Sequence, residues 1–243
     1  MPSMSDQAPE LSIVIPALNE GAMLPGLLGD LLQLAGLHRE VIVVDGGSTD
    51  DTVAVARAHS ATVVDAPRGR GAQLRAGIAT SRAPLLCTLH ADVRLPPAAL
   101  AALTRAAHSP QQAPFAFRLA IDAPGFAFRV VEAGANLRSR WLRLPYGDQG
   151  LVISRSLYDR AGGYPDVPLM EDVALALALK PLTPIRLLDQ HVLVSARRWQ
   201  RDGIVRRTAR NLSLLARYLA GATPAELAAA YEAPVEHAAP NGP

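Results

Sequence analysis

The sequence has one lysine, one cysteine and few aromatic residues, and each scarcity narrows the class of protein. Lys180 is the single lysine, so arginine supplies nearly all the basic side chains, and the formal net charge is only +2. This balance is not typical of a protein that coats nucleic acid, and no nucleic-acid partner is expected. Cys87 lies in an apolar run without a partner for an internal disulfide, which fits a reducing compartment and a buried thiol.

Some longer signatures are also missing. No apolar run approaches the roughly 20 residues that a membrane span needs, and the start MPSMSDQAPE is polar, unlike a signal peptide. We therefore expect a soluble, cytoplasmic protein. Neither G-x-G-x-x-G nor G-x-x-x-x-G-K-[ST] follows an expected strand, which disfavours a Rossmann dinucleotide site and a P-loop.

The composition and length indicate one large α/β domain. Apolar residues make up 49% of the 243 residues and aromatics only 5%, which is typical of helices packed on a largely parallel sheet. No internal repeat or dividing linker is visible. We expect a single domain over residues 11–231, preceded by a disordered start (1–10) and followed by a loose tail (232–243).

The first half alternates strands and helices. Short links between them indicate parallel strands joined by right-handed crossovers. Ser48 and Asp51 have the spacing of a capping box at a helix start. The expected strands are residues 11–15, 41–45, 61–67 and 85–89, and the expected helices are 24–34, 48–59 and one from the RGRGAQL stretch to about Ser81.

The second half is less regular. Its alternating run 115–121 is typical of an edge or antiparallel strand. The other expected elements are helices over 97–107, 126–143 and 173–181, a loop from Pro145 that enters a strand, a helix broken by Gly162 and Gly163, two strands at 185–188 and 192–195, and the last helices.

Polar side chains follow three of the expected strands. Asn19 and Glu20 come after the first, Asp45 ends the second, and the apolar run 85–89 stops at His90, Ala91 and Asp92. Because the carboxyl ends of parallel strands share one edge, these side chains are expected to converge on one polar ligand site. Taken singly, Asp92 would instead be a turn former or helix cap, and Asp45 a cap for the next helix.

Arg68 and Arg70 alternate with Gly69 and Gly71. Glycine permits close backbone approach and the guanidinium fork matches phosphate oxygens, so this loop is a candidate phosphate site. A solvated surface loop is the alternative reading.

Four stretches together resemble a known family. LSIVIPALNE, VIVVDGGSTDDT, HADVRLPP and GGYPDVPLMEDVALA look like a family 2 glycosyltransferase of the GT-A fold, and most like the small bacterial branch labelled rSAM/selenodomain-associated transferase 2. The likeness spans about residues 11 to 220. It implies a GT-A type Rossmann-like sandwich with a mostly parallel sheet and an antiparallel extension, in which residues 11–96 bind a UDP- or GDP-linked sugar and 97–231 shape the acceptor site.

The resemblance assigns donor residues one by one. Pro16, Ala17 and Glu20 would surround the nucleotide, and Asp45 would meet the base. The family's D-x-D motif falls on His90, Ala91 and Asp92, so histidine replaces the first acid. Asp92 keeps the position that holds a divalent metal, Mn²⁺ or Mg²⁺, and imidazole is also a manganese ligand.

The family's acceptor-side acids fall on Glu171 and Asp172. The resemblance makes Asp172 the base of an inverting transfer, which takes the acceptor hydroxyl proton. The alternative is an acidic first turn stabilised by the helix dipole. Tyr146, Asp148 and Gln149 fall where the family meets its acceptor.

SARRWQRDG, from Ser195, matches the Q-x-x-R-W motif of processive members only in part. Arg198 and Trp199 match, but Ser195 replaces the glutamine, which argues against a polymer-extruding synthase. Arg197 and Arg198 are candidate diphosphate ligands, and Trp199 would stack on a sugar unless it is a core residue. His191 is a candidate late metal ligand; a core or surface histidine is the other reading.

The stretch 204–219 is amphipathic and basic. Such a helix can lie on an anionic membrane and present a lipid acceptor, or it can pack on its own core. Two rival functions also stay open. A sugar nucleotidyltransferase would need a glycine-rich, basic loop where this chain has PALNE, and a degenerate binding protein is suggested by His90.

Overall fold

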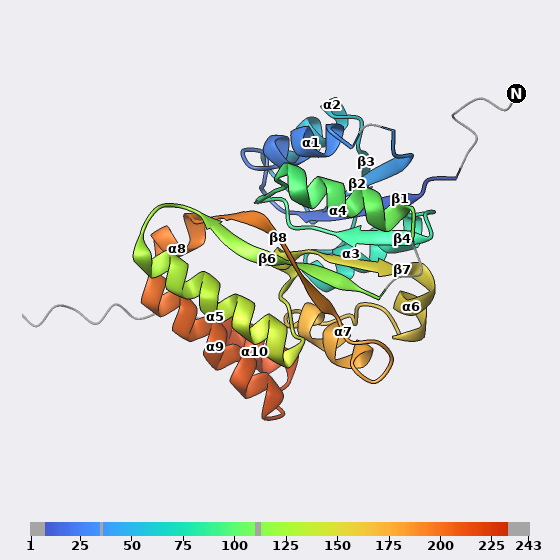
Figure 1. Ribbon diagram of the computed structural model, residues 1–243. Coiled ribbons are helices and arrows are strands. Elements are labelled where there is room, and N and C mark those ends of the chain that lie inside the picture. The colour runs from blue at the N-terminus through green and yellow to red at the C-terminus, as the bar shows by residue number, and fades with distance from the viewer. Residues whose placement is uncertain (1–7, 35, 110–112, 233–243) are drawn as a thin grey trace, which may run out of the picture.

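The computed structural model describes residues 8–34, 36–109 and 113–232 (Figure 1). Most of the expected disordered start and loose tail lies outside these ranges. Within them the chain forms one eight-stranded sheet in the order β3-β2-β1-β4-β7-β6-β8-β5. The strands are β1 Leu11–Ala17, β2 Arg39–Asp45, β3 Thr62–Asp65, β4 Leu85–Thr88, β5 Val93–Arg94, β6 Phe115–Asp122, β7 Leu151–Ser154 and β8 Arg186–Ser195.

The sheet has a parallel half and a mixed half. β1 pairs in parallel with β2 and β4, and β2 pairs in parallel with β3, as the alternation of strands and helices predicted. β7 runs antiparallel to β4 and to β6, and β5 runs antiparallel to β8. The predicted α/β fold with an antiparallel extension is confirmed.

Two strand predictions in the second half have mixed outcomes. Of the two alternatives for β6, the antiparallel one holds, since β6 pairs antiparallel with β7; β6 is not an edge strand, because its other neighbour is β8, with which it pairs in parallel. The two expected strands at 185–188 and 192–195 are one strand, β8, since Asp189 to His191 continue it. β6 pairs with β8 on both sides of an irregularity, Ala116 with Leu187 before it and Arg118 with His191 after it, so tertiary pairing holds the two segments in one strand despite the polar residues between them.

Helices cover both faces of the sheet. Successive β1 side chains enter different apolar clusters: Ile13 and Ile15 pack with α1 and α4, and Val14 packs with α3 and α7. Helices α5, α9 and α10 stack together beside the mixed half (Figure 1). The helices are α1 Leu24–Leu32, α2 Thr52–Ala58, α3 Arg70–Thr80, α4 Pro97–Ala107, α5 Phe126–Leu142, α6 Arg155–Arg160, α7 Glu171–Leu179, α8 Arg197–Asp202, α9 Ile204–Leu219 and α10 Pro224–Glu232, with a 3₁₀ turn η2 at Gly147–Gln149. None of the helices in the described ranges is both long enough and apolar enough to cross a membrane.

Helix α3 lies unusually close to the parallel strands. Gly77 faces β1 and β2, and a Cβ added there would overlap side-chain atoms of Val14 and Val44. One turn earlier, the Gln73 side-chain amide donates hydrogen bonds of 2.8 Å to the carbonyl oxygens of both Ala17 and Val44. These contacts fix the carboxyl ends of β1 and β2, where the candidate site begins.

The loops after β1 and β2 are tied together, and this contact replaces the predicted capping box. Ser48 Oγ accepts the Asn19 amide hydrogen at 2.9 Å, and Asn19 Oδ1 accepts that of Thr49 at 2.8 Å. The Ser48–Asp51 capping box is therefore wrong: α2 begins at Thr52, whose amide hydrogen Asp50 accepts. The exchange places Glu20 beside the end of β4.

Candidate active site

The turn after β4 carries a buried carboxylate with two guanidinium partners. Asp92 is 4% exposed, and its Oδ2 lies 3.1 Å from Arg197 and 3.6 Å from Arg198. Arg197 also donates to Glu20 Oε2 at 2.6 Å, so one guanidinium joins the ends of β1 and β4. Burial opposes ionisation of Asp92, but the Arg198 and Arg197 guanidiniums hold the pKa of its carboxyl below the usual value. The expected convergence of Glu20 and Asp92 at one sheet edge is what the structure has.

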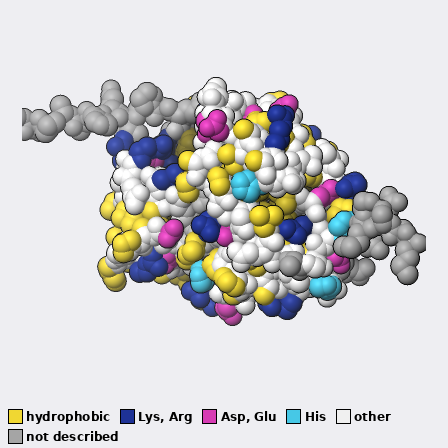
Figure 2. Space-filling model, turned by 90° about the horizontal axis from the view of Figure 1, so that it is seen from above, with side chains coloured by type: hydrophobic (Ala, Val, Ile, Leu, Met, Phe, Trp, Pro, Cys, Tyr) yellow, Lys and Arg dark blue, Asp and Glu magenta, His cyan; other side chains and the backbone are white. Residues whose placement is uncertain are grey.

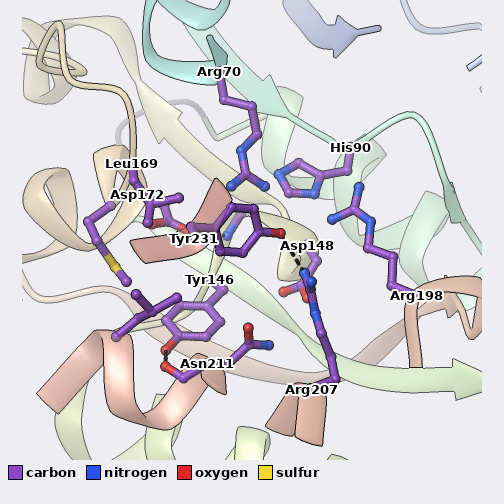
Figure 3. Close-up of a pocket in the computed structure, with 13 residues that line it drawn as sticks. Arg70, His90, Tyr146, Asp148, Leu169, Asp172, Arg198, Arg207, Asn211 and Tyr231 are labelled. Atoms are coloured by element: carbon purple, nitrogen blue, oxygen red, sulfur yellow. Dashed lines mark hydrogen bonds between the residues drawn. The ribbon is translucent and has the colours of Figure 1, made fainter. Parts of the chain in front are cut away.

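A cavity opens next to this ion cluster (Figure 3). In Figure 3, Arg70, His90 and Arg198 face its interior from one side, and Asp172 faces it from another. The acid-rich start of α7 thereby meets the loops that follow the parallel strands. The lining residues are Arg70, His90, Tyr146, Gly147, Asp148, Leu169, Met170, Asp172, Arg198, Arg207, Asn211, Leu214 and Tyr231.

The two acids at the start of α7 have different partners. Glu171 is 2% exposed and pairs with Arg70 at 3.1 Å. Burial raises the pKa of Glu171, and the Arg70 charge opposes that rise. Asp172 lines the cavity, where its Oδ2 accepts the Gly147 amide hydrogen at 2.7 Å, and its Oδ1 accepts that of Val173 at 2.7 Å. Glu171 is thus an internal counter-ion, and Asp172 is the acid available to a ligand.

His90 is held as a neutral imidazole. Burial, followed by the nearby Arg70 charge, lowers the pKa of His90 to about 3. Its ring packs against Gly147, where an added Cβ would lie 2.6 Å from Nε2. A neutral ring nitrogen can accept a hydrogen bond or ligate a metal, which a charged imidazolium cannot do.

The stability of the protein should therefore decrease in mild acid. An unfolded histidine has a pKa of about 6.5. Because the folded pKa is depressed, protons bind preferentially to the unfolded chain, and the contribution of His90 is full above pH 6.5 and lost as pH falls toward 3. We expect this group to lower the free energy of unfolding by about 2 kcal/mol between pH 6.5 and 5.

Chemical denaturation of wild type and His90→Gln at those two pH values measures this loss. The variant should lack it, and His108→Gln, which changes an exposed histidine, should retain it. Equal losses in wild type and His90→Gln would contradict the assignment.

Several other residues predicted for the site are buried or bond neighbouring backbone, and they do not line the cavity. Pro16, Ala17 and Ala91 are buried, and the Asp45 carboxylate accepts the amide hydrogens of Gly47 and Ser48 at 3.0 Å each. Asp45 thus caps its own turn and not the next helix, which begins at Thr52. Arg68 is exposed and does not line the cavity, whereas Arg70 does.

Of the residues predicted for the acceptor side, some line the cavity and others support the fold. Tyr146 and Asp148 line the cavity. Gln149 is fully buried, accepts the Ser139 hydroxyl at 2.6 Å and donates to the Phe117 carbonyl, so it supports the turn and does not face a ligand. Trp199 is 7% exposed and packs beside the ion cluster.

Four lining residues come from α9 and α10 and were not predicted as site residues. Arg207, Asn211 and Leu214 are on α9, and Tyr231 is on α10; Arg207 donates to the Tyr231 hydroxyl at 2.9 Å (Figure 3). Arg207, Asn211 and Leu214 recur at positions i, i+4 and i+7, so they share one helix face. This spacing, which places two polar residues on the same helix face as a buried leucine, is the sequence signal that could have identified them.

The residues present fit a divalent metal that a ligand helps to hold. Among the described side chains there is no group of three His, Cys, Asp or Glu suited to a metal ion. His90 and Asp92, however, are buried, line one cavity and offer a neutral nitrogen and an anionic oxygen. Mg²⁺ commonly takes one or two protein ligands and completes its shell with substrate phosphates and water.

His191 is not placed to join them, which corrects its prediction as a metal ligand. It is exposed and lines a separate cavity with Arg118 and Asp189.

These features place a buried ion cluster and a polar cavity at the carboxyl edge of the parallel strands of a mixed α/β fold, and comparison with known proteins gives the family. The sequence model of Glycosyl transferase family 2 matches residues 12–164, more than half of the chain. The chain belongs to glycosyl transferase family 2, a family of glycosyl-transferring enzymes. The narrower bacterial branch stays a prediction.

Curated relatives match over short stretches. An uncharacterized glycosyltransferase of Mycobacterium tuberculosis strain H37Rv is 40% identical over 83 residues, which is 34% of this chain and 36% of that protein. An undecaprenyl-phosphate 4-deoxy-4-formamido-L-arabinose transferase of Shewanella sediminis is 35% identical over 98 residues, 36% of this chain and 30% of that protein. The chain thus matches about a third of the length of these relatives.

Solved structures share the fold. Glucosyl-3-phosphoglycerate synthase of M. tuberculosis, in complex with Mn²⁺, UDP and glucosyl-3-phosphoglycerate, has a TM-score of 0.55 at 22% identity over 79% of this chain and 71% of that one. A mannosyltransferase of Pyrobaculum calidifontis, in complex with GDP-mannose and Mn²⁺, has a TM-score of 0.57 at 18% identity over 95% of this chain and 77% of that one. The fold is that of the GT-A glycosyltransferases.

Proposed function

We propose that the protein transfers a sugar from a nucleotide-diphosphate sugar, UDP- or GDP-linked, to an acceptor hydroxyl, with inversion. The observation that carries the proposal is the cavity in which Asp172 faces Arg70, His90 and Arg198 beside the Glu20–Arg197–Asp92 ion cluster. A carboxylate and a set of guanidiniums across one cavity match a reaction that removes a proton on one side and releases a diphosphate on the other.

The acidic and basic groups of the cavity have different roles in this reaction. Asp172 takes the proton of the attacking hydroxyl, and the Gly147 amide that it accepts at 2.7 Å orients the carboxylate. Arg198 and Arg70 line the cavity and stabilise the negative charge that grows on the departing diphosphate. They are already in position before reaction, which is why they lower the barrier rather than merely bind substrate.

A divalent metal, Mn²⁺ or Mg²⁺, belongs to the same proposal. Mn²⁺ accompanies the nucleotide in both structural relatives described above. His90 and Asp92 would hold it in this chain, with Glu20 nearby through Arg197. When bound, the metal would supply further positive charge for the diphosphate.

Thermal unfolding with nucleotides tests the donor site. UDP, GDP, CDP and their sugars, each with and without Mn²⁺, should include one nucleotide that stabilises the protein by about 2.7 kcal/mol at a hundredfold excess over its dissociation constant. Asp92→Asn should lose the Mn²⁺-dependent part. Asp166→Asn, which changes an exposed acid paired only with Arg75, is the matched control.

Stabilisation by a nucleotide without turnover of any of its sugars would favour a degenerate binding protein. Stabilisation by none of them would overturn the proposed function.

A further inference from the structure

An exposed apolar stripe runs along α5. Phe126, Val130, Leu137 and Trp141 are 84%, 54%, 59% and 77% exposed. At 3.6 residues per turn these positions fall within about 60° of one another, so they form a single face of the helix. Isolated exposed apolar residues need no explanation, but four large ones aligned on one helix do.

Helix α9 presents a second stripe beside the first. Val205, Leu212 and Leu219 are large apolar residues at seven-residue spacing, and all are at least half exposed. α9 packs against α5, so the two stripes lie on neighbouring helices. In Figure 2, hydrophobic side chains gather at the left edge, the side on which Figure 1 places these helices, with basic side chains beside them.

Basic side chains border both stripes. Arg206 and Arg217 are exposed on α9, and Arg129 and Arg140 are exposed on α5, where they pair with Glu132 at 3.0 Å and Asp189 at 3.7 Å. An apolar face bordered by arginine is the pattern of a helix that lies in the interface of an anionic bilayer.

A cavity of about 280 Å³ lies between the two helices. Val130 and Leu212, which belong to the exposed stripes, line it. Tyr146, Asp148 and Asn211 line it too, and the same three residues line the active-site cavity. The apolar surface and the reaction site therefore share a common wall.

Among the described residues, some that line this cavity carry buried polar atoms without a hydrogen-bond partner. Four buried side-chain nitrogen or oxygen atoms in the described part of the chain lack a hydrogen-bond partner. Three of them, Arg138 Nε, Trp199 Nε1 and Thr208 Oγ1, belong to residues that line this cavity. Buried donors without partners are rare, and a ligand with a polar head would satisfy them.

We infer that this cavity holds the acceptor, a membrane lipid with one long apolar chain and a polar head that carries the acceptor oxygen. The α5 and α9 stripes enter the bilayer interface, the chain occupies the space between Val130 and Leu212, and the head passes Arg138 and Tyr146 toward Asp172. This inference rests on the proposed function, because it supplies the acceptor for the same reaction. A second copy of the protein would also cover the stripes, but it would leave the cavity and its unpartnered donors unused.

Tryptophan fluorescence gives a direct readout of the cavity. The chain has two tryptophans, and Trp199 lines the cavity whereas Trp141 lies on the stripe. In Trp141→Gln, Trp199 is the only emitter. A 12-bromododecyl phosphate probe, used below its micelle concentration, should quench Trp199 by at least half at saturation.

The control compounds distinguish binding of the apolar chain of the probe from binding of its phosphate head. The control variants distinguish binding in the cavity from binding on the protein surface. Inorganic phosphate and unbrominated dodecyl phosphate should not quench. Gly134 lines the cavity with no atom within 4 Å of an added Cβ, so Gly134→Leu in the same background should fill the space and abolish quenching, whereas Gly134→Ala should retain most of it. Absence of quenching in Trp141→Gln, or quenching unchanged by Gly134→Leu, would overturn the lipid site.

Flotation with vesicles tests the stripes. Wild type should float with phosphatidylcholine vesicles that contain 20% phosphatidylglycerol, and Phe126→Gln/Trp141→Gln should float at least tenfold less. Sedimentation equilibrium tests whether a second copy of the protein covers the stripes instead. If wild type forms a dimer that the double variant does not form, and neither binds vesicles, the stripes are a dimer interface and the inference is overturned. Nucleotide stabilisation measured in every variant separates the two proposals, since a retained thermal shift without quenching leaves the proposed function standing.

Discussion

Asp172→Asn should lower the turnover of the donor sugar by about 10²–10⁴-fold, the range that a positioned general base contributes. Asparagine has nearly the same shape and can still accept the Gly147 amide hydrogen, but it cannot take a proton from a hydroxyl. The measurement is release of nucleoside diphosphate from the sugar nucleotide that stabilises the protein, with water or a supplied lipid alcohol as the acceptor.

Two controls distinguish lost chemistry from lost structure. Asp172→Asn should keep the thermal shift with nucleotide, because the residue lies across the cavity from Arg198 and not in the Glu20–Arg197–Asp92 cluster. Asp166→Asn should turn over the donor at the wild-type rate. If Asp172→Asn retained more than a tenth of the wild-type rate, another group would have to be the base.

Gly77→Ala should destabilise the protein by about 1–3 kcal/mol, the usual cost of forcing extra volume into a well-packed core. The new methyl group would overlap Val14 and Val44, both fully or almost fully buried in the two central parallel strands. α3 would have to move outward, and Arg70 at its start and Gln73 would move with it. Thermal and chemical unfolding measure the effect, and nucleotide affinity should fall in parallel.

Gly29→Ala is the matched control for this change. Gly29 also lies inside a helix, α1, but nothing lies within 4 Å of an added Cβ. Alanine is favoured over glycine in a helix by about 1 kcal/mol, so this variant should be as stable as wild type or more so. Equal destabilisation by both substitutions would show that backbone effects, and not the overlap at Gly77, are responsible.

The sequence was most informative where one physical signal acted alone. In the first half, apolar runs separated by helical periodicity predicted β1, β2, β3 and β4 and their parallel pairing. β1 and β4 are buried on both faces and read as continuous apolar stretches, whereas β3 is a half-exposed edge strand that its two valines still signalled. The expected helix over 97–107 has the bounds observed for α4. The shared sheet edge then brought Glu20 and Asp92 together as predicted.

Prediction failed where partners distant in sequence decided the outcome. β8 continues through Asp189 because β6 pairs with the residues on both sides of it, and Ser48 bonds the Asn19 loop because that loop packs against it. The sequence assigned Glu171 and Asp172 to one acidic pair, but only the fold shows that Arg70 neutralises the first and leaves the second in the cavity. Arg207 and Tyr231 were missed since their helices reach the site only through tertiary packing.

The Arg197 contact has a consequence for how the protein is made. It joins Glu20 across 177 residues and Asp92 across 105, and the short strand β5 that follows Asp92 finds its partner in β8, nearly 100 residues later. On the ribosome, the parallel half emerges first with both carboxylates but without the guanidinium that separates their charges, and like charges at close range repel. The ion cluster can therefore form only after Arg197 has emerged, so this edge of the sheet is completed later than the strands that carry its two carboxylates.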